Sequence, residues 1–234
     1  MKKRISNILF WVVLTLAVVV LVVVAVYGFK GWKMYKTALE ECSVEEKAAS
    51  IRYQASYTPL SELPAIYKDA VLAAEDHRFY SHNGVDPISL ARAIWNNVRT
   101  FSLREGGSTV TQQLAKNIYF SQERKFERKI AEIFMARKLE EELEKDEILE
   151  LYINCIYYGS GYYCIYEAAV GYFDKEPSEL SDYECTLLAG LPNAPSVYDP
   201  TVNPDLAEER RQQVLDKMVR YGYLSETQAK EIHS

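Results

Sequence analysis

The longest apolar stretch of the chain lies near its N-terminus. Residues 8–27 read ILFWVVLTLAVVVLVVVAVY, in which Thr15 is the one polar side chain. Twenty helical residues span about 30 Å, the thickness of the hydrocarbon core of a bilayer. The run is longer than the apolar region of a cleaved signal peptide, and it continues into residues 28–30 without a small-residue cleavage site. The pattern predicts an uncleaved transmembrane signal anchor over 8–27.

Basic residues on both sides of this run bear on its orientation: Lys2, Lys3 and Arg4 precede it, and Lys30, Lys33 and Lys36 follow it. The positive-inside rule gives most weight to the basic head of a first span, although the lysines behind the span weaken the bias. We expect residues 1–7 in the cytoplasm and the rest of the chain outside it.

Beyond the anchor, residues 28–60 are mixed and charged, which favours a stalk or short helical linker. Prolines at positions 59 and 64 punctuate its end, so the sequence predicts a domain over 61–234. Within that domain the apolar positions recur with helical rather than alternating spacing, and no internal repeat is visible. Helices are expected around or over 70–74, 87–98, 109–114, 121–145, 148–153, 165–174, 178–190, 204–220 and 225–232. The predicted fold class is mainly α.

Composition narrows the function classes. The net charge of −6 argues against nucleic-acid binding, which usually requires a basic domain. An oxidising compartment would permit disulfides, and Cys155 and Cys164 are the closest pair, but isolated thiols are the default for Cys42, Cys155, Cys164 and Cys185. Their spacing does not resemble a zinc site.

Candidate chemistry begins at residues 75–86, which read EDHRFYSHNGVD after an apolar run. A helix there would carry Glu75 and Asp76 at its C-terminal end. Buried carboxylates titrate nearer neutrality than exposed ones, which is how general acids and bases are tuned. A helix that simply reaches solvent, with both acids hydrated, is the alternative.

A second polar stretch, residues 106–117, reads GGSTVTQQLAKN. Ser108 or Thr109 is placed to cap a helix, whose free N–H groups favour anions. Thr109, Gln113 and Lys116 are spaced four and three residues apart and so share one helix face. A hydroxyl, an amide and an ammonium on one face suit a sugar joined to a phosphate, and a capped surface helix with a polar stripe is the alternative.

The third stretch, FERKIAEIFMARKLEEE, starts at residue 126. Its later glutamates are typical of a solvated helix face. Glu132 differs because apolar residues surround it and Arg128 lies one turn before it. An ordinary ion pair and a second carboxylate facing Glu75 across a cleft are both compatible with this pattern.

These stretches resemble the peptidoglycan glycosyltransferase family, the family 51 glycosyltransferases. This family includes the polymerising domain of class A penicillin-binding proteins and stand-alone transglycosylases. Five blocks match in order: EDHRFYSHNGVD, GGSTVTQQLAKN, RKIAE, KDEILELYINCIYYG, and AAVGYFDKEPSEL leading to LLAGLPNAPSVYDP. The match covers about residues 61–200 and leaves no room for a transpeptidase domain, so the chain resembles the monofunctional type.

The resemblance implies a lysozyme-like, mostly helical fold and inverting transfer of a glycan from polyprenyl pyrophosphate to the 4-hydroxyl of lipid II. It implies Glu75 as general base and Glu132 as the second catalytic glutamate. Lys116, Arg128 and Lys129 would neutralise the pyrophosphate. The remaining motif positions would shape the groove: Asp76, Phe79, His82, Thr109, Gln113 and Asn117. A divalent cation, Mg²⁺ or Mn²⁺, at the pyrophosphate is compatible with the family but not required.

The same resemblance implies a bacterial cell-membrane location with the catalytic domain outside the cytoplasm, sensitivity to moenomycin, and as partners the nascent glycan strand, transpeptidases and division or elongation proteins. Membrane contact is expected from Ile94, Trp95, Val98, Phe101 and Leu103, with core packing as the alternative. Cys164 stands where the family commonly has glycine, and a positive φ there would strain it. A lysozyme-like lytic enzyme and a non-catalytic scaffold are the competing functions.

Overall fold

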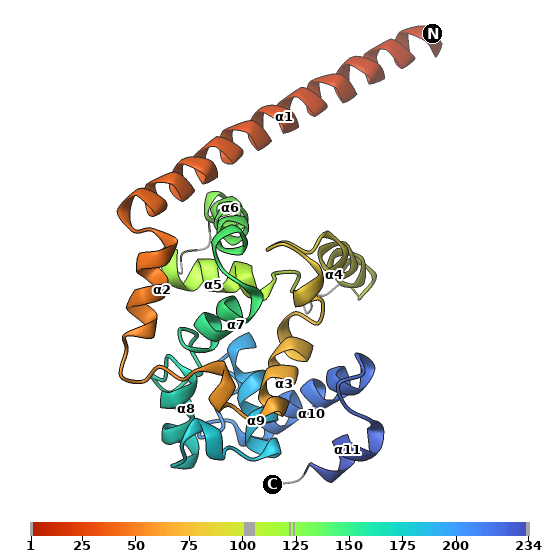
Figure 1. Ribbon diagram of the computed structural model, residues 1–234. Helices are drawn as coiled ribbons and strands as arrows, with labels where there is room; N and C mark the ends of the chain where they lie inside the picture. The colour runs from red at the N-terminus through yellow and green to blue at the C-terminus, as the bar shows by residue number, and fades with distance from the viewer. Residues whose placement is uncertain (1, 101–105, 122, 124, 233–234) are drawn as a thin grey trace.

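The computed structural model describes residues 2–100, 106–121, 123 and 125–232. The helices fall into a compact domain and one long helix that projects from it (Figure 1). No strand occurs in those described ranges, which hold only the isolated bridges Asn83–Val85 and Gly159–Tyr162. The predicted mainly α fold class is confirmed.

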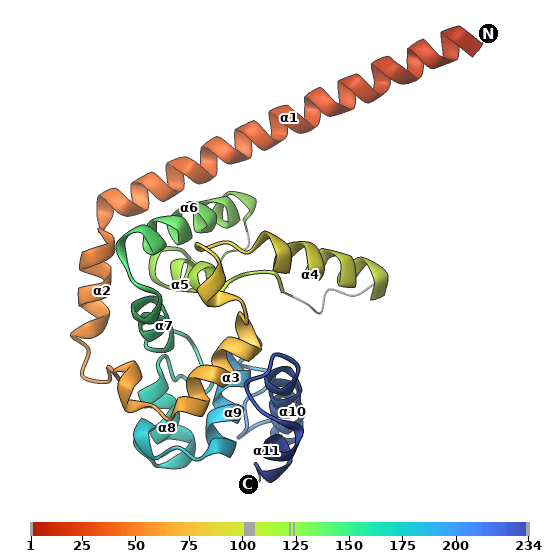
Figure 2. The same ribbon diagram turned by 45° about the vertical axis from the view of Figure 1, so that its right-hand side comes forward.

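Helix α1 (Lys2–Glu41) contains the predicted anchor and continues beyond it without a break. Its large apolar side chains from Phe10 to Val26 are mostly exposed. In the described part of the chain it is the one helix long and apolar enough to cross a membrane, with a mean hydropathy of 3.0 in its most apolar window. Only the C-terminal part of α1 meets the domain, where it runs over α6 (Figure 2).

The segment 28–60, expected as a stalk or linker, is built into the domain. Helix α2 (Val44–Arg52) begins at a capping box in which Ser43 and Glu46 satisfy each other's backbone N–H groups. Val44, Ala48 and Ile51 are buried in the common core. The domain's packed core therefore starts before residue 61, because α2 has an apolar face that the charged residues around it conceal in the sequence.

One half of the domain packs α3 (Ala65–Glu75) against α9 (Asp182–Gly190) and α10 (Pro204–Arg220). Helix α3 is buried on nearly all sides over residues 70–74, where three alanines admit close neighbours. Helix α8 (Ile165–Phe173) and the short α11 (Glu226–Glu231) cover this half. The α3 helix thus runs through the core and ends at Glu75.

The other half holds α5 (Val110–Tyr119), α6 (Phe126–Glu142) and α7 (Lys145–Ile153). The single helix predicted over 121–145 is shorter, because Leu143 is extended and Glu144 begins a new capping box for α7. The helix predicted over 178–190 likewise starts later, at Asp182, because Ser181 caps it after a turn of 3-10 helix, η3 (Pro177–Glu179). Both corrections come from caps within a charged sequence.

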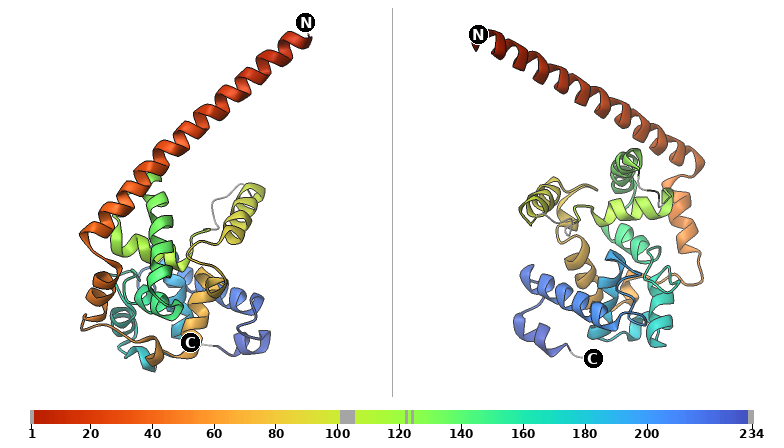
Figure 3. Two further views of the ribbon diagram at one scale, coloured as in Figure 1. Left: turned by 45° about the horizontal axis from the view of Figure 1, so that its top comes forward. Right: turned by 180° about the vertical axis from the view of Figure 1, so that it is seen from behind.

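Helix α4 (Pro87–Thr100) stands out from the side of the domain (Figure 3). Ile94, Trp95 and Val98 are 56%, 68% and 65% exposed, so core packing does not account for them. Phe101 and Leu103, the other residues expected at the membrane, lie outside the described residues. Three further 3-10 turns complete the fold: η1 (Leu60–Glu62), η2 (Phe79–Ser81) and η4 (Leu191–Asn193).

The four cysteines are unpaired. Cys164 has a φ of −151°, which any residue adopts, and its thiol accepts a hydrogen bond from the N–H of Glu167 at the start of α8. The positive φ angles of this loop fall on Gly159, Ser160 and Gly161 instead. Cys164 therefore occupies this position without the backbone strain that a positive φ would cause.

Candidate active site

A cavity of about 750 Å³ lies where the two halves of the domain and α4 meet. Its walls come from the end of α3, from α4, α5 and α6, and from α10. Six of the predicted site residues line it: Glu75, Asp76, Gln113, Lys116, Lys129 and Glu132. A smaller cavity of about 310 Å³ adjoins it, since Gln113, Lys116 and Pro192 line both. Asn117 lines the smaller cavity, beside Tyr157 and Tyr163.

Glu75 is the last residue of α3, and its side chain is only 8% exposed. Its Oε2 accepts a hydrogen bond of 2.7 Å from Nε2 of Gln113. Its Oε1 is buried and accepts no hydrogen bond, although Arg210 Nη2 lies 4.0 Å away. One oxygen is thus held in place while the other is left able to accept a proton.

The side chain of Gln113 is itself oriented by Tyr152. Its Oε1 accepts a hydrogen bond of 3.3 Å from the hydroxyl of Tyr152 on α7. Tyr152 is fully buried, and burial raises the pKa of its hydroxyl well above the ordinary value, with the charge of Glu75 adding to the effect. The hydroxyl therefore stays protonated as a donor, which directs the amide N–H of Gln113 at Glu75.

A cationic cluster of Lys116, Arg128 and Lys129 surrounds the buried Glu132. Glu132 is 1% exposed. Its Oε2 accepts a hydrogen bond of 2.9 Å from Lys129 Nζ. Arg128 Nε lies 3.1 Å from the other oxygen, close enough for an ion pair but without hydrogen-bond geometry. Three cations against one carboxylate leave the cluster net positive, which suits an anionic group.

Lys116 is the cluster member most affected by its surroundings. Burial lowers the pKa of its ammonium, the charge of Glu132 opposes that change, and the neighbouring Arg128 and Lys129 add to it. Lys116 thus lies in the wall shared by the two cavities as a partly desolvated cation. A desolvated charge interacts more strongly with a bound anion than one in water does.

The other predicted motif residues support this wall. The Asp76 carboxylate accepts hydrogen bonds from His82 Nε2 at 2.9 Å and from the N–H of Val110 at 3.1 Å, so it joins the end of α3 to the start of α5. Thr109 caps α5 and donates to the carbonyl of Gly84 at 2.6 Å. Phe79, His82 and Thr109 are buried and line neither cavity. Thr109 therefore does not share the exposed face of Gln113 and Lys116.

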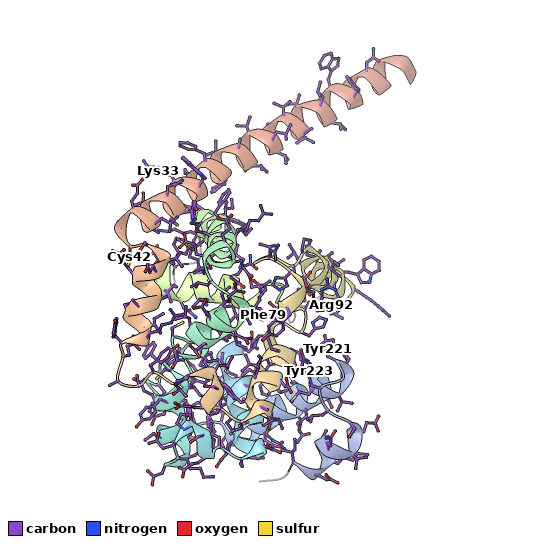
Figure 4. The ribbon with its side chains drawn as sticks, in the orientation of Figure 1. Lys33, Cys42, Phe79, Arg92, Tyr221 and Tyr223 are labelled. Atoms are coloured by element: carbon purple, nitrogen blue, oxygen red, sulfur yellow. The ribbon has the colours of Figure 1, made fainter. Side chains whose placement is uncertain are left out.

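The far end of the cavity contains groups that the sequence did not single out. Arg92 of α4 lies near Tyr221, which follows α10 (Figure 4). His77 lies between them, with its ring stacked on Tyr221 at 3.8 Å and its Nε2 3.4 Å from Arg92 Nη1. Arg210 of α10 is 6% exposed and donates to the carbonyl of Gly190. Arg92, Arg210 and Tyr221 lie outside the motifs, and His77 lies in the stretch 75–86 with no local sign of its role, because the neighbours of all four come from distant parts of the chain.

A divalent cation would have few protein ligands here. Both oxygens of Glu132 face cations, and the part of the chain that the structure describes holds no group of three or more His, Cys, Asp or Glu residues able to bind a metal. The side chains present therefore do not form a dedicated metal site, and an ion at this point would depend on ligands from a bound phosphate.

Fold and site together define a helical protein with a membrane-length helix and a cleft that joins a buried carboxylate, Glu75, to a cationic cluster around a second one, Glu132. Such a cleft suits transfer of a group away from an anionic leaving group. The model of the transglycosylase family matches residues 44–219, and the chain belongs to this family.

Relatives of known name share the matched region. Penicillin-binding protein 1A of Neisseria flavescens is 48% identical over 169 residues, which are 72% of this chain and 21% of that protein. Penicillin-binding protein 1F of Bacillus subtilis is 42% identical over 170 residues, 73% of this chain and 24% of that protein. A 2.6 Å crystal structure of penicillin-binding protein 1A from Haemophilus influenzae matches with a TM-score of 0.45 and 26% identity, over 75% of this chain and 16% of that one. The chain thus spans less than a quarter of the length of these relatives.

Proposed function

We propose that this chain polymerises peptidoglycan glycan strands from lipid II. The growing strand on its polyprenyl pyrophosphate is the donor, and the 4-hydroxyl of lipid II is the acceptor. This assignment extends the family membership to a particular substrate, and the chemistry of the cleft supports it. A sugar hydroxyl is a poor nucleophile at neutral pH and needs a base, whereas a pyrophosphate leaves readily once its charge is compensated.

The observation that carries the proposal is the free Oε1 of Glu75 in a cavity that also reaches the cationic cluster. In the proposed step the acceptor oxygen bonds to the anomeric carbon of the donor while Oε1 of Glu75 takes the hydroxyl proton. The bond from that carbon to the pyrophosphate oxygen breaks, and the pyrophosphate keeps the electron pair. Attack from the face opposite the leaving group converts the α anomer to β.

The cationic cluster would receive the leaving group. Before substrate arrives, Lys116 is held by burial, and Arg128 and Lys129 are held by their ion pairs with Glu132. Preorganised charges of this kind stabilise the transition state without having to reorganise during the reaction. Glu132 then acts by holding the cations in place, and its ion pairs with Arg128 and Lys129 support that role.

The proposed function also implies a position for the protein relative to the membrane. Helix α1 would cross the bacterial cell membrane with residues 1–7 in the cytoplasm and the domain outside it. The exposed side chains of Ile94, Trp95 and Val98 on α4 would contact the same membrane. A substrate with a polyprenyl tail stays in the bilayer, so both features would hold the cleft where lipid II is found. Transpeptidases and division or elongation proteins are the expected partners.

The test is polymerisation of labelled lipid II by the full chain in detergent, with Glu75→Gln as the variant. Wild-type protein should form glycan chains, and Glu75→Gln should lose about a hundredfold or more, the scale typical of general-base removal. Glu209→Gln is the matched control, because Glu209 is exposed on α10 and outside both cavities. It should polymerise at the wild-type rate.

Other results of this assay would change the assignment. Chains from both the wild type and Glu75→Gln would keep the function and remove Glu75 as base. Cleavage of preformed glycan would make the protein a lytic enzyme. Lipid II binding without either reaction in the folded wild type would favour a scaffold role.

A further inference from the structure

Helices α1 and α6 cross at Gly31 with very little space between them. A Cβ added to Gly31 would lie 2.6 Å from Cβ of Ile130, 2.7 Å from its Cγ2 and 2.8 Å from the carbonyl oxygen of Glu127. All three distances are shorter than real carbon contacts, and one involves backbone that cannot swing aside. Glycine is therefore what allows the two helices to approach this closely at the crossing.

Aromatic pairs flank the crossing, one on each side. The rings of Tyr27 and Phe126 lie 6.1 Å apart edge to face, and those of Tyr35 and Phe134 lie 5.7 Å apart and stacked. Both helices advance four residues from one contact to the next, from 27 to 31 to 35 on α1 and from 126 to 130 to 134 on α6. The two helices therefore run in the same chain direction and keep a fixed register over about two turns.

The part of α6 held in this way carries the cationic cluster. Arg128, Lys129 and Glu132 all lie between Phe126 and Phe134. Lys125, at the start of α6, provides no side-chain cap. Helix α5 contacts α6 as well and contributes Lys116. The first turns of α6 are thus placed by α5 and by α1, and only α1 connects them to the membrane-length apolar run.

We infer that α1 is a positioning element of the pyrophosphate site and that Gly31 is the contact through which it acts. The inference rests on the proposed function. A tether would need only a linker between membrane and domain, but α1 is one continuous helix from Lys2 to Glu41 and passes through the crossing. The angle of the helix in the membrane is therefore transmitted to α6 and to its cations. Misplacement of a catalytic group by about 1 Å can cost about a hundredfold in rate.

The test compares Gly31→Val with Gly28→Val in the full chain, reconstituted in lipid vesicles. Gly28 lies one turn earlier on the same helix, and a Cβ there would meet nothing within 4 Å. The two variants therefore have the same change in helix propensity and hydrophobicity and differ only in the crossing. Polymerisation of labelled lipid II gives kcat and KM, and moenomycin binding gives a second readout of the anion site, with Lys116→Ala as its reference.

Gly31→Val should polymerise at least tenfold more slowly and bind moenomycin more weakly, in the same direction as Lys116→Ala. Gly28→Val should stay within twofold of the wild type. Equal values for Gly31→Val and Gly28→Val would overturn the inference and leave α1 as a tether. Should Gly31→Val fail to fold, Gly31→Ala decides in the same way, because it adds only the Cβ that clashes. A wild type that makes no glycan would instead refute the proposed function, and the inference with it.

Discussion

At the scale of single residues, the chemistry of the cleft depends on a short hydrogen-bonded chain from Tyr152 through Gln113 to Glu75. An amide can be turned either way round, and each orientation presents a different group to its neighbour. The hydroxyl of Tyr152 supplies a donor to the Gln113 oxygen, so the amide nitrogen faces the carboxylate. Residues on three helices, α3, α5 and α7, thus combine to hold one oxygen of Glu75 and leave the other free.

We therefore expect Tyr152→Phe to lower kcat by about three- to tenfold with little change in KM, the effect of losing one hydrogen bond of ordinary strength. The phenyl ring fills the same buried space, so the fold should persist. Tyr158→Phe is the matched control, since Tyr158 is equally buried but its hydroxyl bonds to Tyr67. Steady-state polymerisation kinetics decide the point, and an unchanged kcat in Tyr152→Phe would show that Gln113 needs no support.

A second prediction concerns Lys116 and pH. Because burial lowers the pKa of its ammonium, the protein should lose this charge at a lower pH than an exposed lysine does. Anion binding should be complete below the lowered pKa and weaken as the pH rises through it. Lys116→Arg, whose guanidinium stays charged, should keep its affinity for moenomycin over the pH range in which the wild type loses it, and that range lies below the pH at which an exposed lysine titrates.

The control for that titration is Lys129→Arg, because the Lys129 side chain is 46% exposed, whereas Lys116 is partly desolvated. It should retain the wild-type profile. A wild-type affinity that stays flat up to the pH at which free lysine titrates would contradict the assignment.

The sequence indicated some of these residues and missed others for a physical reason. Gln113 and Lys116 fall on one face of a helix, and helical spacing alone places them together. Tyr152 lies amid leucine and isoleucine, where a tyrosine is ordinarily a core residue. Its partner Gln113 is 39 residues away, and Arg210 is still farther from Glu75. Contacts across such distances depend on how helices pack, which no local pattern records.

At the scale of elements, α4 depends on one carboxylate at its start. Asp86 is 1% exposed, and it accepts hydrogen bonds from the N–H of Ile88 at 3.0 Å, from Ser89 Oγ at 2.6 Å and from Arg78 Nε at 2.9 Å. Burial raises the pKa of Asp86, but the bonds from Ser89, Ile88 and Arg78 outweigh it and lower the pKa to about 2. The ionised carboxylate therefore stabilises the fold.

Asp86→Ala should reduce the free energy of unfolding by about 1–2 kcal/mol at pH 7, the typical value of a helix cap. The folded pKa is below the unfolded one, so this contribution is present above about pH 4 and is lost as the pH falls toward 2. The difference between wild type and variant, measured by urea unfolding, should shrink at pH 3. Equal losses at pH 7 and pH 3 would exclude a role for the charge, and Asp86→Asn separates the charge from the cap.

The sequence predicted the presence of the helices better than the residues at which they begin and end. The helices over 204–220 and 165–174 follow from clear periodicity, and the structure has them at Pro204–Arg220 and Ile165–Phe173. The division between α6 and α7 was missed because the charged run around Glu144 continues a helical pattern. The break depends on Leu143, which is extended although its N–H still bonds to the Leu139 carbonyl. Packing, rather than the local sequence, determines this conformation.

At the scale of the whole molecule, two apolar features lie outside the core. Helix α1 and the exposed face of α4 both project from the domain (Figures 1 and 3). Arg92 of α4 lines the cleft at one end, and Lys129 of α6, on which α1 packs, lines it at the other. In the proposed function both features would therefore contact the bilayer that contains the substrate.

Because α1 is continuous, it also fixes the distance between the apolar run and the contact with α6. The apolar run ends at Tyr27, which packs on Phe126 at the start of α6, and the crossing at Gly31 lies four residues, or about 6 Å, farther along the helix. In the proposed function, helix α1 would therefore set the cationic cluster at the depth of the lipid headgroups. Each residue added between the run and the crossing would raise the cluster by about 1.5 Å and turn it by about 100°.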